Sequence, residues 1–382
     1  MPQGTKPMDQ ELQAEFVPEF VGHTVWQIKA STLCNLRCKY CYEWDRLADR
    51  RRMTVEQWRY VFEAAVDYQR LRYEKNGNFS KTVFAWHGGE ASLLPPDYVK
   101  EVLELQVEIL GQQVLDDRRF INAIQTNLYR INKTLDLMVE KGFIVSTSLD
   151  YKSGARVDAA GNDVETQVLA NLEKILNRGV TCGVALVLGR HNYKDLPEIH
   201  DHLENIGASW LHIIPMLDPP VNAPAANLQL SIAETIEALK TLYIHRHHNG
   251  SRFHVSIMNR VKETVDNYRK GVPNTWQKDR DHDGETRIVV HPDGIIAVLA
   301  GSAEPPRVLG NLFEQKFQEI FESPEYAASL ADDAQKRANH CEHCRYEKFC
   351  DQRPVLDGPV GLAKGPCMID SKLCEFAEQY AS

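Results

Sequence analysis

The strongest constraint on the fold is a regular alternation of short apolar runs and longer amphipathic stretches over residues 24–215. The apolar runs are typical of strands, and they are Thr24–Ala30, Thr82–Trp86, Phe120–Thr126, Phe143–Leu149, Thr181–Leu188 and Trp210–Pro215. The stretches between them have helical periodicity, and they are Thr54–Tyr73, Pro96–Leu110, Lys133–Lys141, Glu165–Arg178 and Leu196–Ile206. This alternation predicts an α/β fold with a parallel sheet and right-handed crossovers. Six units are fewer than the eight of a full barrel, so the pattern allows a partial barrel or an open doubly wound sheet.

The remainder of the chain has a weaker pattern. A helical stretch, Ser231–His247, follows the sixth predicted strand, and the polar region His248–Glu285 is expected to form an exposed loop or linker. Two further strand-like runs, Thr286–Val290 and Ile295–Leu299, flank a hairpin-type turn at His291–Gly294. From there to the end we expect a loop-rich, cysteine-rich region.

Composition restricts the class of protein. The chain has 382 residues, of which 43% are hydrophobic and 25% charged, as in soluble globular proteins that need no disulfides. Its net charge of −9 argues against a nucleic-acid or anionic-membrane partner. No apolar run reaches the ~18 residues of a membrane span, and Met1–Glu19 lacks the apolar segment of a signal peptide. We therefore expect a cytoplasmic protein.

The nine cysteines fall into two distant groups. Three lie between Cys34 and Cys41, five lie between Cys341 and Cys374, and Cys182 stands alone in an apolar run, where a buried core thiol is expected. Because the cytosol keeps thiols reduced, disulfides are not expected. The two groups predict two metal sites.

The first group has the spacing Cys34-x-x-x-Cys38-x-x-Cys41, directly after the first predicted strand. Three thiolates on one short loop can hold three corners of a cubane iron–sulfur cluster. No fourth protein ligand lies nearby in the sequence, so one iron would remain open, as in catalytic metal sites. The alternatives are a zinc ion with a distant fourth ligand, or buried cysteines without a metal.

This spacing, followed by the aromatic Tyr42, resembles the signature of the radical S-adenosylmethionine (SAM) superfamily. The resemblance implies a [4Fe-4S] cluster whose open iron binds SAM, and reductive cleavage of SAM to a 5′-deoxyadenosyl radical that abstracts hydrogen from substrate. It also implies a partial (β/α)6 TIM-like barrel with a small cysteine-rich C-terminal auxiliary-cluster domain. Electrons would come from a reducing partner such as flavodoxin or ferredoxin.

Further motifs follow successive predicted strands at their carboxyl ends, where barrel enzymes place their sites. They resemble family motifs and read Gly88-Gly89-Glu90, Gln125-Thr126-Asn127, Ser148-Leu149-Asp150 and Val187-Leu188-Gly189-Arg190. The SAM-binding residues that the resemblance implies are Tyr42, Gly88, Gly89, Glu90, Gln125, Asn127, Ser148, Asp150, Arg156 and Leu188. Ordinary glycine turns and strand caps are the alternatives. The family usually has glycine after the aspartate; this chain has Tyr151, so the loop there is expected to differ.

The second group, Cys341-x-x-Cys344-x5-Cys350 with later cysteines, resembles the SPASM/twitch extension of peptide-modifying radical SAM enzymes. Full members have seven cysteines and two auxiliary clusters. Here the cysteines expected after residues 291–294 are missing and Pro354 replaces another, so the resemblance implies one auxiliary [4Fe-4S] cluster. Its ligands would be Cys341, Cys344 and Cys350 with a fourth cysteine, for which Cys374 is the best match and Cys367 a substitute or fifth ligand. A zinc knot is the alternative.

These observations predict three segments: an N-terminal extension (1–22), a radical SAM partial barrel (23–265) and a SPASM/twitch-like auxiliary domain (266–382). About 22 residues before the first strand are too few for a separate leader-peptide-binding domain. Asp218, after the sixth predicted strand, is a candidate general base by position, and a helix or turn cap is its alternative role.

The resemblance implies oxidative modification or crosslinking of a ribosomally made precursor peptide or of a protein side chain. Three alternatives stay open. One is a radical SAM enzyme acting on a small metabolite. A second is formylglycine formation like that of anaerobic sulfatase maturases, against which the missing cysteines argue. The third is an iron–sulfur electron carrier without catalytic activity.

Overall fold

A single nine-stranded sheet, in the order β6-β5-β4-β3-β2-β1-β7-β8-β9, runs through the protein. The computed structural model describes residues 20–151, 153–216, 227–274, 287–298, 307–350 and 367–380. The strands are β1 (Phe20–Ser31), β2 (Phe79–Gly88), β3 (Phe120–Thr126), β4 (Ile144–Ser148), β5 (Cys182–Leu188), β6 (Leu211–Pro215), β7 (Arg287–Val290), β8 (Ile295–Val298) and β9 (Arg307–Asn311). Neighbours from β6 to β7 pair in parallel, and β8 and β9 add antiparallel.

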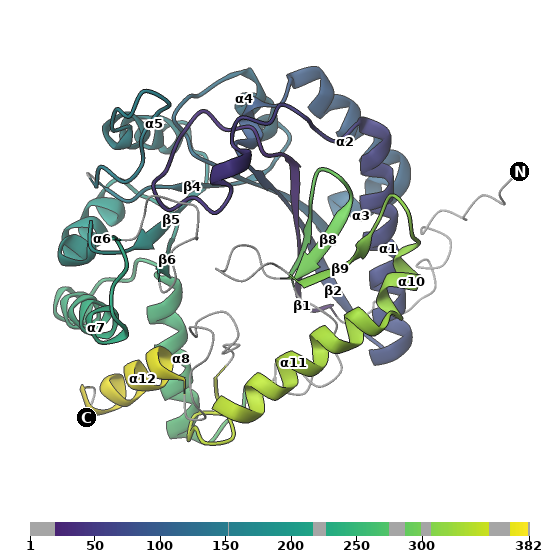
Figure 1. Cartoon of the computed structure of the whole chain (residues 1–382). Helices are drawn as coiled ribbons and strands as arrows, with labels where there is room; N and C mark the ends of the chain where they lie inside the picture. The colour runs from purple at the N-terminus through teal and green to yellow at the C-terminus, as the bar shows by residue number, and fades with distance from the viewer. Residues whose placement is uncertain are drawn as a thin grey trace, which may run out of the picture.

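Helices α1–α7 follow one another around the outside of the curved sheet (Figure 1). They are α1 (Val55–Asn76), α2 (Pro96–Leu110), α3 (Gln112–Asp116), α4 (Lys133–Glu140), α5 (Glu165–Asn177), α6 (Leu196–Asn205) and α7 (Ile232–Asn249), with short 3-10 turns at Trp44–Arg46, Ala91–Leu93 and Tyr193–Asp195. Helices on one face of a curved parallel sheet confirm the predicted partial barrel rather than a doubly wound sheet. No helix in the described ranges is both long and apolar enough to span a membrane.

The core between sheet and helices depends on large aromatic side chains. Trp26 of β1 lies edge-on to Tyr68 of α1 at 6.3 Å, and Trp86 of β2 packs against Trp58 of α1 at 4.3 Å between ring centroids. A capping box at Thr54, the first residue of the predicted helical stretch, begins α1. Because side chains alternate along a strand, the residues between these aromatics point to the inner face of the sheet.

Two expectations for the C-terminal part were wrong. The predicted loop over His248–Glu285 contains helix α8 (Ser256–Lys270), whose buried residues include Ile257, Val261 and Val265. Its many charged residues hide this apolar stripe in the sequence. The region expected to be loop-rich also contains α10 (Phe317–Phe321), α11 (Pro324–His340) and α12 (Met368–Tyr380).

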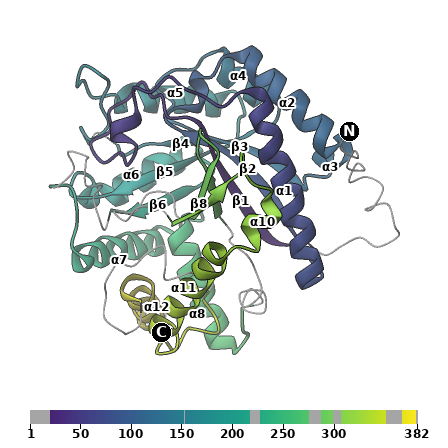
Figure 2. The same cartoon turned by 45° about the vertical axis from the view of Figure 1, so that its right-hand side comes forward.

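Helix α12 packs against α7 and α8, beside the opening of the curved sheet (Figures 1 and 2). The predicted hairpin turn after β7 is confirmed, with the Gly294 N–H donating to the His291 carbonyl at 3.0 Å. The predicted boundary between residues 265 and 266 falls within α8, and the division into domains stays a prediction.

Candidate active site

The loop after β1 carries Cys34, Cys38 and Cys41 at the carboxyl end of the parallel strands. Backbone hydrogen bonds hold it: the Arg37 N–H donates to the Val157 carbonyl at 2.7 Å, and the Cys34 N–H to the Leu47 carbonyl at 3.0 Å. All three cysteines are half-buried. The chain's own backbone therefore shapes a three-thiol loop.

The environment of these thiols favours their protonated form. Burial is the main cause that raises the pKa of Cys34 to about 11 and of Cys41 to about 12, and the charge of Cys38 raises both further. Burial raises the pKa of Cys38 as well. Since metal ligands are thiolates, a bound metal must displace these protons, so metal binding is expected to weaken as the pH falls.

The spacing of the thiols bears on the kind of metal. Around one tetrahedral zinc, thiolates lie about 3.8 Å apart. Among the residues that the structure describes, three ligand atoms lie within 4.8 Å of one another in one group, His200, Asp201 and His245 on α6 and α7, and in neither cysteine group. The three cysteines of the loop are instead candidates for the three protein ligands of a cubane cluster because they share one short segment.

Gly88 and Gly89, predicted to approach a ligand, pack against the cysteine loop. A Cβ on Gly89 would lie 2.2 Å from the carbonyl oxygens of Thr32 and Leu33, and Gly88 has a φ of 107°. The Gly89 N–H donates to the Ser31 carbonyl at 3.1 Å. Glycine is required at these positions because the end of β2 touches the loop backbone.

The buried Glu90 joins the ends of two strands. Its carboxylate accepts hydrogen bonds from the Thr126 hydroxyl at 2.8 Å and from the Asn127 N–H at 2.5 Å. The Asn127 amide lies 3.7 Å from the Cys34 sulfur. Glu90 thus positions Asn127 beside the cysteine loop, and its role in SAM binding stays a prediction.

The other predicted site residues lie in different surroundings. The Gln125 amide donates to the Ser148 hydroxyl at 2.8 Å, at the ends of β3 and β4. Leu188 is fully buried in the hydrophobic core, so its side chain points away from the inner face. The exposed ring of Tyr42 lies 4.9 Å from the Lys29 ammonium. Asp218 lies outside the described residues.

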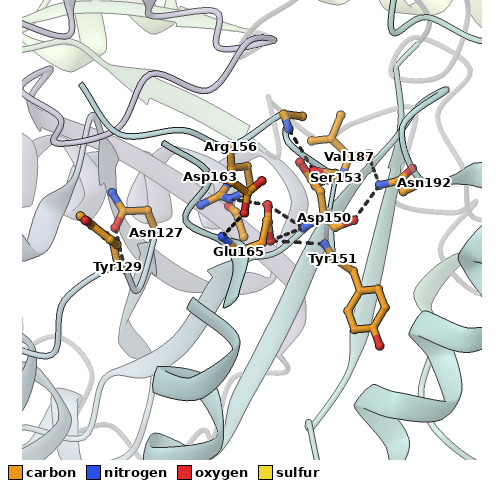
Figure 3. A network of polar contacts seen from close by, with 12 residues as sticks. Asn127, Tyr129, Asp150, Tyr151, Ser153, Arg156, Asp163, Glu165, Val187 and Asn192 are labelled. Carbon is orange, nitrogen blue, oxygen red and sulfur yellow. Dashed lines mark hydrogen bonds and ion pairs between the residues drawn. The ribbon is translucent and has the colours of Figure 1, made fainter. Parts of the chain in front are cut away.

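Asp150 lies at the centre of a buried polar network (Figure 3). Its carboxylate accepts from the Val187 N–H at 3.0 Å and from the Tyr40 hydroxyl. Its own N–H donates to the Glu165 carboxylate at 3.2 Å, and its carbonyl accepts from the Asn192 amide at 3.3 Å. The network ties together the loops that follow β1, β4 and β5.

Tyr151 adopts the left-handed conformation that glycine favours, with a φ of 62°. This conformation costs roughly 1–2 kcal/mol for an L-residue. The side chain is buried and its hydroxyl donates to Glu198 at 3.1 Å, which helps to offset that cost. Tyr151 therefore takes up a backbone conformation that suits glycine, and the expected difference of this loop from the family's loop stays a prediction.

Arg156 has unsatisfied donors in a buried position. It is 2% exposed, its Nε lies 3.4 Å from a Glu165 oxygen, and its Nη1 donates to the Tyr40 hydroxyl at 3.4 Å. Among the described residues its Nη2 has no hydrogen-bond partner. Its positive charge lowers the pKa of Cys38, which places it close to the cysteine loop. An unsatisfied guanidinium donor there fits the carboxylate of SAM.

Sequence reasoning missed His191. Its ring stacks on Tyr40 with centroids 6.1 Å apart, and its Nε2 lies 3.8 Å from a carboxylate oxygen of Asp150. Neither ring nitrogen has a hydrogen-bond partner within the described ranges. Its place directly after the motif that ends at Arg190 was the available signal.

The C-terminal cysteines also come together. Cys344 and Cys350 lie in turns after α11, Cys367 precedes α12, and Cys374 lies within α12. After burial, the charges of Cys344 and Cys350 are among the causes that raise the pKa of both Cys367 and Cys374. The Cys344 N–H donates to the Cys341 carbonyl at 2.8 Å. The five C-terminal cysteines therefore lie close to one another.

Substitutions should separate the two candidates for the fourth ligand. We expect Cys374→Ala to remove about four irons per reconstituted chain, because this thiol is held inside the first turns of α12. We expect Cys367→Ala to retain them. Iron analysis of the two variants beside the wild type is the measurement. Equal loss from both would mean that both thiols are needed, and loss from Cys367→Ala alone would reverse the assignment.

A partial α/β barrel with a three-thiol loop at its catalytic face and a second thiol group beside it is the architecture of an iron–sulfur enzyme. Residues 28–203 match the family described as the radical SAM superfamily, and residues 282–345 match the SPASM iron–sulfur cluster-binding domain. The chain belongs to the radical SAM superfamily and carries a SPASM region.

Among curated proteins, the chain is 22% identical over 335 residues to a cysteine-type anaerobic sulfatase-maturating enzyme of Clostridium perfringens, covering 84% of this chain and 85% of that one. A serine-type enzyme of Klebsiella aerogenes is 23% identical over 343 residues, covering 83% and 76%.

Among solved structures, anSMEcpe with bound AdoMet and Cp18Cys peptide has a TM-score of 0.69 at 19% identity, covering 94% of this chain and 97% of that one. Streptococcus suis SuiB bound to precursor peptide SuiA has a TM-score of 0.58 at 14% identity, covering 93% and 76%. At these identities the two structures show a shared fold.

Proposed function

We propose that this radical SAM enzyme oxidatively modifies or crosslinks a side chain of a ribosomally made peptide or of a protein. The observation that carries the proposal is the combination of the three-thiol loop with a SPASM region packed beside the barrel opening. Two curated relatives are named as sulfatase-maturating enzymes, and two structures of the same fold contain bound peptides. When bound, SAM supplies a 5′-deoxyadenosyl radical that abstracts hydrogen from the substrate.

The chain's own residues have three tasks in this proposal. Cys34, Cys38 and Cys41 hold the cluster, and Arg156 offers its buried Nη2 to the SAM carboxylate. The Asp150 network keeps the surrounding loops fixed and shields that donor from water. We further propose that the C-terminal cysteines hold one auxiliary [4Fe-4S] cluster.

A second candidate is formylglycine formation on a sulfatase. It is favoured by two relatives that are named as anaerobic sulfatase-maturating enzymes and whose matches cover more than four fifths of this chain. The cysteines missing after residues 291–294 argue against it, because the two-cluster form of those enzymes has them.

Anaerobic reconstitution tests these proposals. We expect about eight irons per chain and 5′-deoxyadenosine on reduction with dithionite in the presence of SAM. Peptides encoded beside the gene, and sulfatase-type peptides containing cysteine or serine, should then be assayed by mass spectrometry. Loss of two hydrogens from an encoded peptide supports the leading proposal, and an aldehyde on a sulfatase peptide supports the second. Deoxyadenosine without change in any peptide, together with turnover of a small metabolite, would contradict both.

A further inference from the structure

Arg287, the first residue of β7, lies on the inner face of the sheet. Strand pairing puts it opposite Val25 of β1, whereas Ile288 is opposite Trp26. Trp26 packs against Phe317 on the outer, helix-covered side. Because residues opposite each other in neighbouring strands share a face, the Arg287 side chain points to the inner face, where it is exposed.

The strand at the far edge of the barrel presents His212 to the same interior. In β6, His212 and Ile214 are exposed and alternate with buried neighbours, and Ile214 is 42% exposed. Arg287 contributes to a lowered pKa of His212, about 4, although burial is the larger cause. Strands so far apart in the sheet order interact only because the sheet curves around. His212 is thus open to water yet surrounded by protein, as expected inside a half-closed barrel.

The positive charge of Arg287 is not balanced by a carboxylate of the described residues. Among the described residues, the one titratable group that raises the pKa of Arg287 is Tyr42, the aromatic residue after Cys41. The nearby His87 and His212 have pKa values lowered to about 4 and are neutral at pH 7. Lys29 also contributes to lowering the pKa of His87, but its own charge is neutralised by Glu43 at 2.5 Å.

Arg287 is exposed inside the barrel, and no carboxylate of the described residues competes for it, so its guanidinium is available to bind an anion by charge-assisted hydrogen bonds. Carboxylates suit it best among peptide groups, because the planar guanidinium donates two parallel hydrogen bonds to them. The place is also suitable for a substrate, since Tyr42 adjoins the cluster loop while His212 and Ile214 line the opposite wall.

We propose that Arg287 binds a carboxylate of the substrate inside the barrel, either an Asp or Glu side chain near the modified residue or the C-terminal carboxylate of a peptide. This inference rests on the proposed function. It makes Arg287 a specificity-determining residue and predicts an enzyme that selects acidic peptides.

The test uses the anaerobically reconstituted protein with SAM and four fluorescein-labelled random peptide pools. The pools carry a central Glu or Gln, and a free or amidated C-terminus. Fluorescence anisotropy should show that one of the two carboxylates tightens binding by about tenfold or more, as expected of a charge-assisted hydrogen bond. Which pool gains distinguishes the side chain from the terminus.

Arg287→Gln should abolish this preference, Arg287→Lys should keep part of it, and Arg287→Glu should reverse it toward the pool that lacks that carboxylate. Arg70→Gln, on the exposed face of α1 where Arg70 pairs with Asp67, is the matched control and should change nothing. Equal binding of all four pools, or an acidic preference that survives in Arg287→Gln, would overturn the inference alone. Absence of binding by any pool would overturn the peptide proposal and this inference with it.

Discussion

Cys38→Ala is expected to abolish 5′-deoxyadenosine formation and to remove about four irons per chain, while the auxiliary cluster remains. A cluster held at three corners cannot keep its geometry on two thiolates, and Cys38 is the central ligand of the loop. The Arg156 guanidinium interacts electrostatically with the Cys38 thiol, so Cys38→Ala also removes a neighbour of Arg156. Iron analysis and chromatography of the nucleoside product after reduction with dithionite are the measurements.

Cys182→Ala is the matched control for that substitution, because Cys182 is fully buried in β5 and far along the chain from either group, as predicted for a core thiol. It should retain both the iron and the cleavage of SAM. Wild-type rates of deoxyadenosine formation in Cys38→Ala would contradict the assignment of the loop as the catalytic cluster site.

Glu43→Leu is expected to destabilise the protein by about 3–5 kcal/mol. Glu43 and Lys29 form an ion pair at 2.5 Å with side chains 6% and 4% exposed, so removing the carboxylate leaves a buried ammonium. The pair ties the segment after Cys41 to β1, and Lys29 also lies 4.9 Å from the Tyr42 ring centre. Anaerobic unfolding in urea measures the loss, and iron content should fall with it.

The double variant Lys29→Met/Glu43→Leu should recover most of this stability, because no unpaired charge remains. The same change in an exposed pair, Glu56→Leu beside Arg59, is the control and should cost less than about 1 kcal/mol. A double variant as unstable as Glu43→Leu would show that the carboxylate acts through packing instead of charge.

The strands of the barrel were predictable because their apolar runs are short, and β3 agrees with the predicted Phe120–Thr126 at both ends. Helix α8 was not predicted, because its apolar stripe is narrow and is interrupted in the sequence by charged residues. The two cysteine groups were also predictable from the sequence, because the spacing of ligands along a loop is a local property.

The polar parts of the site were less predictable. Glu90 and Asp150 were singled out from their motifs, but the sequence does not show that their carboxylates pair with Thr126 and Tyr40. The position of Arg287 depends on strand pairing and on the curvature of the sheet. Such properties arise from the whole fold, so a single sequence cannot show which side chains meet across the barrel.

The place of β1 between β2 and β7 has a consequence for the order of folding. The strand made first is flanked on one side by a strand synthesised only after all six barrel strands. Until β7 emerges from the ribosome, the backbone from Val25 to Ile28 presents an open edge on which another chain can pair. Contacts so distant in sequence form slowly and leave intermediates exposed. We therefore expect a chain truncated before Arg287 to keep the edge of β1 unpaired and to aggregate more readily than the full chain.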